Sequence, residues 1–187
     1  SERQVLFKKP ENALNIMSIS FLRMANGDIG AFYIVKHADG TDEIVLTRSS
    51  DEGENWTTPE SCTKGILPDD YYVINNDRAV MLKNGRILLP IARHTIHNDT
   101  TDFSPGELLF IYSDDDGATW KKSSAELTST KKNDPNGFQE PGIFEFNDGT
   151  LWCYIRTGLG FQFECYSKDK GETWSQPCPN TFFSSPC

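Results

Sequence analysis

The residues best suited to chemistry are a glutamate and an arginine at the two ends of one expected hairpin. Glu140 precedes an apolar strand, Arg156 ends the next one, and an Asp148-Gly149 pair between the strands predicts a type I′ turn. A planar guanidinium binds carboxylates through paired hydrogen bonds, and a carboxylate can accept a proton from an acidic hydroxyl. Charged groups at the ends of apolar strands are costly to bury alone, so this pair is a candidate site. The alternative is that the two charges pair with each other or lie at solvated strand ends.

Similar positions on two earlier hairpins are also polar. Asn15 and Arg78 precede the first strands, and Lys36 and Arg93 end the second strands. Asp77 and His94 adjoin these positions and could transfer protons or bind substrate. In the alternative interpretation Asp77 forms a local ion pair with Arg78, and His94 is a structural histidine.

Three repeated units must position these side chains. In each, an Asn-Gly or Asp-Gly turn joins two apolar strands, and a third strand enters an octet of the form Ser-x-Asp-x-Gly-x-x-Trp. Short Ser and Asp side chains bind turn amides, Gly can adopt positive φ, and Trp returns a large apolar surface to the sheet. The octets occupy residues 49–56, 113–120 and 167–174. We therefore expect three four-stranded antiparallel units, at about residues 12–62, 71–125 and 138–180.

The octet resembles the Asp box of sialidases (neuraminidases) and related β-propellers, and the resemblance covers nearly the whole chain. It implies an all-β fold, a six-bladed β-propeller of sialidase type, to which this chain contributes about three blades. Residues 181–187 then read as the lead-in to a further blade. The remaining blades would come from the rest of a longer chain or from another subunit, because propellers close with about 4 to 8 blades.

The resemblance also implies roles for particular residues. Glu140 would be the base that polarises a tyrosine nucleophile, and Arg156 would bind the carboxylate of the sugar. The catalytic acid of the family lies between the second and third strands of the first blade, where Asp39 and Asp42 are available; a solvated turn is the alternative for each. Asn15 stands where the family usually has its first arginine, and Arg78 could replace it.

These residues favour a sialidase-like glycoside hydrolase acting on terminal, acidic sugars of glycans, with the tyrosine and the last arginine on later blades. This fragment alone would then be inactive. The alternatives are a carbohydrate-binding propeller without activity and an enzyme acting on an uncharged sugar or a uronic acid.

Composition excludes several other classes. A net charge of -9 argues against a nucleic-acid partner, whose phosphates require a basic surface. The sequence has no long apolar run for a membrane span and no signal-peptide pattern at its start, although the resemblance favours a secreted or periplasmic location. The spacing of its His, Cys and acidic residues predicts neither a metal site nor a cofactor. Its five cysteines are an odd number, and we expect most to be buried or free thiols.

Overall fold

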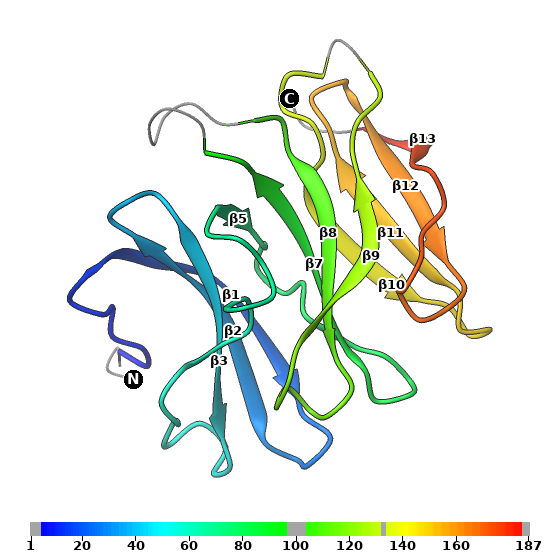
Figure 1. The fold of residues 1–187 in the computed structure, drawn as a ribbon. Coiled ribbons are helices and arrows are strands. Elements are labelled where there is room, and N and C mark those ends of the chain that lie inside the picture. Colours follow the sequence, from blue (N-terminus) through cyan, green and yellow to red (C-terminus); the bar gives the residue numbers. More distant parts are fainter. Residues whose placement is uncertain (1–4, 97–103, 132–133, 185–187) are drawn as a thin grey trace.

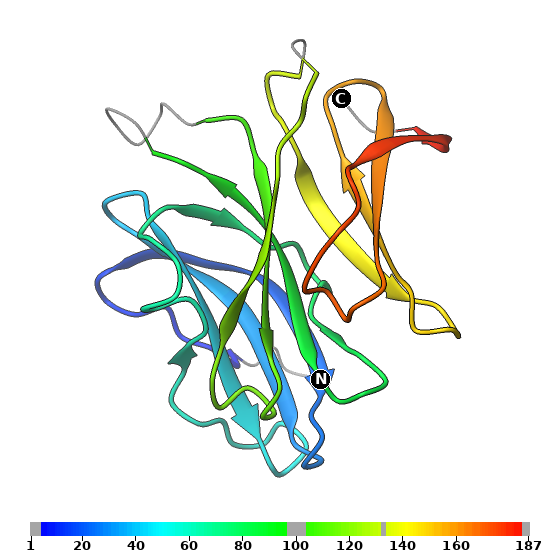
Figure 2. The same cartoon turned by 45° about the vertical axis from the view of Figure 1, so that its right-hand side comes forward.

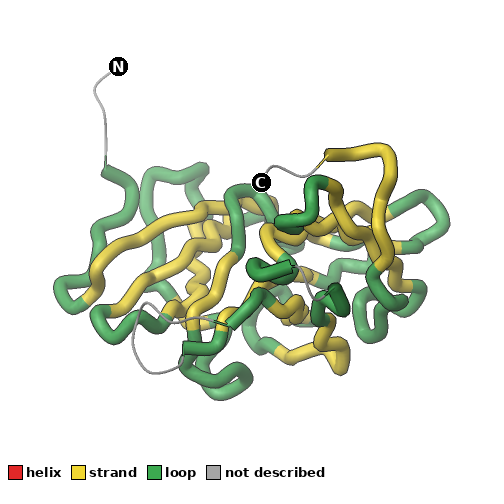
Figure 3. Tube along the Cα trace, turned by 90° about the horizontal axis from the view of Figure 1, so that it is seen from above, coloured by secondary structure: helices red, strands yellow, loops and turns green. Residues whose placement is uncertain are grey.

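The computed structural model describes residues 5–96, 104–131 and 134–184, which form strands and loops and no helix (Figure 3). No helix long and apolar enough to cross a membrane therefore occurs in these ranges. Three antiparallel sheets fan out in chain order, from the blue and cyan strands through green to the orange ones (Figure 1). The prediction of three antiparallel β-units is confirmed.

The first sheet has the order β1-β2-β3-β4, and its strands are β1 (Ala13–Arg23), β2 (Ile29–His37), β3 (Asp42–Ser49) and β4 (Glu60–Ser61). The third has the order β10-β11-β12-β13, with β10 (Gln139–Glu145), β11 (Leu151–Arg156), β12 (Phe161–Ser167) and β13 (Cys178–Ser184). Residues 181–184, expected in the lead-in to another blade, thus pair as part of the outer strand of this sheet. Residues 185–187 lie outside the described residues.

The second sheet differs from the expected four strands because its first strand is split. Both β5 (Tyr71–Val73) and β6 (Val80–Met81) pair with β7 (Ile87–His94), which continues into β8 (Glu107–Ser113) and β9 (Lys121–Leu127). Asp77 lies in the interruption with a positive φ of 56°. Residues 74–79 leave the ladder with β7, whereas Ser18 within β1 and Glu140 within β10 have a similar φ without ending their strands.

The predicted positions of the hairpins are confirmed, but the prediction of type I′ turns is wrong. Gly27, Gly85 and Gly149 have φ between 84° and 94°, whereas the preceding Asn or Asp in each hairpin does not have positive φ. In the first hairpin the Gly27 amide donates to Met24 O at 3.0 Å and the Met24 amide to Asp28 O at 2.9 Å. This is the three-residue loop in which a glycine bulge supplies the twist.

The three octets fold alike. In the first, Ser49 Oγ donates to Asp51 Oδ1 and accepts from the Gly53 amide, both at 2.8 Å, and Asp51 Oδ1 accepts from the Asn55 amide at 2.9 Å. Hydrogen bonds from Asn55 and Ser49 lower the pKa of Asp51 to about 2. The Trp56 indole donates to Gly53 O at 3.0 Å, which folds its ring back over the turn.

The second and third octets join neighbouring sheets. Trp120 packs edge-on against Phe32 of β2, with ring centroids 6.0 Å apart, and Trp174 stacks on Phe110 of β8 at 4.3 Å. Trp56 instead contacts Phe7 and Phe21, within the first unit. One apolar core lies between the first and second sheets and another between the second and third. Figure 2 shows the third sheet, yellow to orange, beside the green strands of the second.

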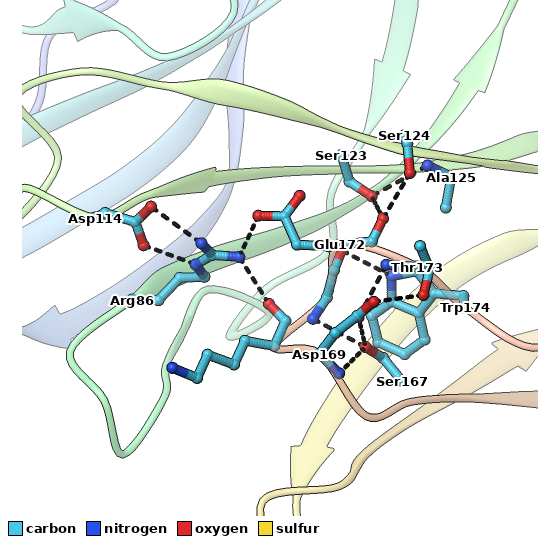
Figure 4. A network of polar contacts seen from close by, with 12 residues as sticks. Arg86, Asp114, Ser123, Ser124, Ala125, Ser167, Asp169, Glu172, Thr173 and Trp174 are labelled. Carbon is cyan, nitrogen blue, oxygen red and sulfur yellow. Dashed lines mark hydrogen bonds and ion pairs between the residues drawn. The ribbon is translucent and has the colours of Figure 1, made fainter.

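A polar network reinforces the junction of the second and third sheets (Figure 4). Arg86 binds both carboxylate oxygens of Asp114, at 2.7 and 3.0 Å, and donates to Glu172 of the third octet at 2.9 Å. Ser123 and Ser124 of β9 donate to Glu172 O, each at 2.9 Å. The octets therefore fix the angle between sheets and bring the strand ends of different sheets together.

Candidate functional site

Strand ends and loops of all three sheets surround one polar pocket of about 510 Å³. Its lining comes from β2, β5, β7, β10, β11 and two connecting loops: Lys36, Tyr71, Val73, His94, Ser104, Pro135, Asn136, Gln139 and Arg156. A second pocket of about 510 Å³ lies beside Trp56 and has a largely apolar lining from the first unit and the N-terminal segment. Ionisable side chains from several sheets converge only at the first of these two pockets, which we call the mouth pocket.

Arg156 lines this pocket and pairs with Glu140, which is not itself a lining residue. Arg156 Nη1 donates to Glu140 Oε1 at 2.8 Å, and about a third of each side chain is exposed. Glu140 has a φ of 46° at an irregularity of β10, between Gln139 and Gly142. A non-glycine residue in this region is strained, and such strain gathers at functional sites. The backbone thus aims this carboxylate out of the regular alternation of the strand.

The absence of a side chain at Gly142 leaves space for the ring of Tyr154. Gly142 lies opposite Tyr154 in the β10–β11 register, and a β-carbon added to it would meet the Tyr154 ring at 2.2 Å. The tyrosine ring therefore lies over the first strand of the third sheet, where it also meets Arg78, whose guanidinium carbon is 5.6 Å from the ring centroid. This contact places Arg78 close to the third sheet.

His94 is a hydrogen-bonded part of the pocket wall. Its Nδ1 lies 2.9 Å from Ser104 O, and its Nε2 lies 3.0 Å from the amide nitrogen of Gln139, which also donates to Asn136 O at 2.7 Å. Since a carbonyl only accepts and an amide nitrogen only donates, Nδ1 carries the proton and Nε2 is the acceptor. His94 thus holds the Gln139 amide at the pocket.

Lys36 brings a cation from the first sheet. Its ammonium nitrogen is 4.4 Å from the centroid of the Tyr71 ring, which indicates a cation–π contact. Within the described residues no carboxylate forms an ion pair with Lys36. Lys36 and Arg156 therefore supply positive charge from two different sheets, and this local charge opposes the acidic character of the whole chain.

The two aspartates expected near the catalytic acid lie in different environments. Asp42 is 5% exposed, and its Oδ1 has no hydrogen-bond partner in the described part of the chain. Desolvation raises the pKa of Asp42 to about 7, although Lys36 and His37 oppose the shift. Asp39 is exposed and accepts hydrogen bonds from the Thr41 hydroxyl and amide, which lower its pKa. Asp42 is thus a carboxyl able to hold a proton near neutral pH, and Asp39 stabilises a turn. Asp42 does not line the mouth pocket but a separate pocket of about 170 Å³, together with His37 and Tyr72.

The remaining expected residues, Arg78 among them, also lie outside the lining of the mouth pocket. Arg93 projects away, where it pairs with Glu107 at 2.5 Å and approaches Glu126 at 3.9 Å. Asn15 is exposed and accepts a hydrogen bond from the Ile16 amide with its own Oδ1. Asp77 is also exposed, and the ion pair with Arg78 considered from the sequence is absent among the described residues.

Several pocket residues were not identified from the sequence. Tyr71, Ser104, Asn136 and Gln139 lie on a very short strand, on two loops and at a strand start, without a repeated pattern to mark them. The available signal was the varying length of the loops, which is typical of a ligand-binding side. In the described ranges no group of three or more His, Cys, Asp or Glu side chains could hold a metal ion.

Comparison with known proteins gives consistent matches. The family model described as a BNR repeat-like domain matches residues 1–185. A sialidase of Clostridium perfringens is 27% identical over 202 residues, covering 93% of this chain and 52% of the relative. An anhydrosialidase of the leech Macrobdella decora is 30% identical over 146 residues, or 74% of this chain and 17% of the relative. The chain thus spans about half the length of the clostridial relative.

Solved structures match in the same way. A leech intramolecular trans-sialidase complexed with 2,7-anhydro-Neu5Ac has a TM-score of 0.61 and 28% identity, covering 80% of this chain and 21% of that one. An α-L-arabinanase of Penicillium chrysogenum complexed with arabinobiose has a TM-score of 0.65 at 19% identity, covering 95% of this chain and 53% of that one. The second likeness concerns the fold alone.

Proposed function

The chain belongs to the BNR repeat-like family, which includes sialidases, and on this premise we propose that it supplies three blades of a six-bladed sialidase-like glycoside hydrolase. Its substrates are terminal, acidic sugars of glycans. The single observation that carries the proposal is the Glu140–Arg156 pair at a pocket built by three sheets. The other blades come from the rest of a longer chain or from another subunit.

Each member of the pair has a defined task in this mechanism. Arg156 binds the sugar carboxylate, which competes with Glu140 for the guanidinium. Glu140 then accepts the proton of a tyrosine nucleophile, whose free pKa near 10 would otherwise leave it unreactive. The tyrosine attacks the anomeric carbon, a covalent glycosyl–enzyme intermediate forms, and water releases the sugar with retained configuration. Because the tyrosine and further arginines act from other blades, we expect these 187 residues alone to be inactive.

On the side of the first sheet the proposed site includes Lys36, which lines the mouth pocket, and its register partner Asp42, which lines the adjoining smaller pocket. A carboxyl with a pKa near 7 can protonate the departing glycosidic oxygen. Asn15 occupies the position where the family usually has its first arginine. Lys36 is the register partner of Asn15 and supplies positive charge close to that position. Arg78, near Tyr154, is the candidate for further substrate binding from the second sheet.

Two other functions are each favoured by a specific observation. The lack of an arginine at Asn15 favours a carbohydrate-binding propeller without turnover. The hydrogen-bonded His94 and Gln139 in the pocket wall favour an enzyme for an uncharged sugar or a uronic acid, because amide and imidazole groups bind sugar hydroxyls.

Hydrolysis by the full-length protein of matched nitrophenyl glycosides, namely an α-sialoside, a uronide and a neutral sugar, distinguishes these possibilities. We expect the sialoside to give the highest kcat/KM and the Arg156→Lys variant to lose about 100-fold, because a lysine cannot bind a carboxylate through two parallel hydrogen bonds. Arg93→Lys is the matched control, since Arg93 lies outside the pocket lining, and it should retain activity. A higher kcat/KM on the uronide or the neutral glycoside favours the enzyme for a uronic acid or an uncharged sugar. Binding to glycans without hydrolysis of any substrate favours the carbohydrate-binding propeller.

A further inference from the structure

Two cysteines face each other across the middle of the third sheet. Cys153 of β11 and Cys165 of β12 are direct partners in the antiparallel register, and both are completely buried. They belong to the apolar core between the second and third sheets, together with Leu88, Phe110 and Ile155. Both are free thiols in the structure, where the Cys153 thiol donates to Tyr154 O at 3.9 Å.

The strand pairing gives this pair the dimensions of a disulfide. Directly opposed residues of antiparallel strands have α-carbons about 4.5 to 5.5 Å apart, and disulfides join residues whose α-carbons are about 4.4 to 6.8 Å apart. We propose that Cys153 and Cys165 form a cross-strand disulfide linking β11 to β12 when the protein folds in an oxidising compartment.

The bond forms by thiol–disulfide exchange with a small-molecule or protein disulfide. The thiolate of one cysteine attacks the oxidant, releases one thiol and forms a mixed disulfide; the second cysteine then displaces the other thiol. Two protein thiols are thereby oxidised, and one disulfide is reduced to two thiols. In the folded state burial and the neighbouring thiol raise the pKa of Cys153, so the nucleophilic thiolate is scarce. Exchange therefore takes place before the third sheet packs on the second.

The described part of the chain offers neither cysteine a second partner. Cys62 is buried in the other core, between the first and second sheets. Cys178 is exposed and lies opposite Glu164, whose side chain points to the other face of β12 from that of Cys165. A single pairing is thus expected. The disulfide would covalently link β11, which ends at Arg156, to β12, which leads into the third octet.

The order of the sequence allows a direct test. Trypsin cleaves after Arg156 and Lys168, so Cys153 and Cys165 fall in two different peptides, each with a single cysteine. The full-length protein is secreted into the bacterial periplasm, its free thiols are alkylated in denaturant, and the digest is analysed by mass spectrometry without reduction. We expect the two peptides to be joined and to separate after reduction. Two alkylated, unlinked peptides, or linkage of either to a peptide carrying another cysteine, would overturn the proposal.

A thermal measurement tests the linkage independently. Closing the short loop between the two cysteines should raise Tm by about 5 °C, so dithiothreitol should lower the Tm of the oxidised protein by that amount. The Cys165→Ala variant should show no response to dithiothreitol, while Cys62→Ala should respond like the parent protein. In the parent and in Cys165→Ala, resistance of Cys62 to alkylation before denaturation reports that the sample is folded, and a single cooperative thermal transition reports it for Cys62→Ala. Equal responses in the Cys165→Ala variant and the parent would also contradict the proposal.

Discussion

Glu140 accepts a 2.8 Å hydrogen bond from Arg156 while its own backbone has a φ of 46°. The first strand of the first sheet has a left-handed residue too, Ser18 with a φ of 60°, and Asp77 with 56° lies where the first strand of the second is interrupted. Each is a non-glycine residue in a conformation that glycine adopts without strain. The first strand of each sheet, or its interruption, thus carries one left-handed non-glycine residue, and only that of the third sheet bears the carboxylate paired with Arg156.

Glycine substitutions should separate strain from function. Ser18→Gly and Asp77→Gly should each stabilise the protein by up to about 1 kcal/mol, because the left-handed conformation no longer meets a β-carbon. Glu140→Gly should leave stability nearly unchanged, since relief of strain offsets the lost ion pair, but should abolish hydrolysis. Urea unfolding and initial rates measure both quantities. If Asp77→Gly removed activity as completely as Glu140→Gly, the special position of Glu140 would be refuted.

Asp42 should make stability fall as the pH rises. Its folded pKa of about 7 exceeds the ordinary value of 3.8, so between these values only the unfolded chain loses the proton. The unfolding free energy therefore decreases from about pH 4 to 7, and the loss is complete above pH 7. Relative to the parent, Asp42→Asn should gain about 2 kcal/mol more at pH 8 than at pH 4 after allowance for partial solvation. Asp39→Asn, at a carboxylate whose pKa is lowered, should give a small change of opposite sign in the same urea titrations.

Proton donation by Asp42 predicts a second pH effect, on catalysis. The acid must be protonated, so kcat/KM should fall above about pH 7. Asp42→Asn should remove this alkaline limb and lower the rate by about 100-fold or more on an alkyl glycoside, but much less on a nitrophenyl glycoside, whose leaving group needs little protonation. An unchanged pH profile in Asp42→Asn would exclude the role. Asp39→Asn serves as the control with no expected effect.

Arg86 should be essential to the junction between the second and third sheets. Besides binding Asp114 and Glu172, its guanidinium carbon lies 3.8 Å from the centroid of the Tyr112 ring. Arg86→Lys cannot keep these contacts together and should cost about 2 kcal/mol in urea unfolding. Arg23→Lys is the matched control, because Arg23 pairs with Glu52 of the first octet at an exposed position, where solvent screens the pair, and it should leave stability nearly unchanged. Equal losses would show that the octet networks do not join the sheets.

Much of the fold was predictable because local patterns determine it. The Ser, Asp, Gly and Trp positions of the octets dictate their own hydrogen bonds, and the alternating apolar strands leave few other sheet arrangements. The turn type was not predictable in this way, since a Gly after Asn or Asp suits both a type I′ turn and a glycine bulge. The split of the first strand of the second sheet, where residues 74–79 leave the ladder, is not revealed by any periodicity.

The candidate site was predictable only where a repeat marked it. Hairpin ends identified Glu140, Arg156, Lys36 and His94 as candidates, but the sequence does not show which face of a sheet lines the pocket. Successive residues of a strand point to opposite faces, so His94 lines the pocket while its neighbour Arg93 binds Glu107 on the other face. Tyr71 and Gln139 reach the pocket through the angle between sheets, which depends on packing across the whole chain.

The most direct test of the proposed site is kcat/KM of the full-length protein and its Glu140→Gln variant on a nitrophenyl α-sialoside. Glutamine has the shape of glutamate but cannot accept the tyrosine proton, so we predict a loss of about 100- to 10,000-fold with near-normal binding of a sialic acid analogue. Parent-like turnover by Glu140→Gln would contradict the assignment of the Glu140–Arg156 pair as the catalytic centre.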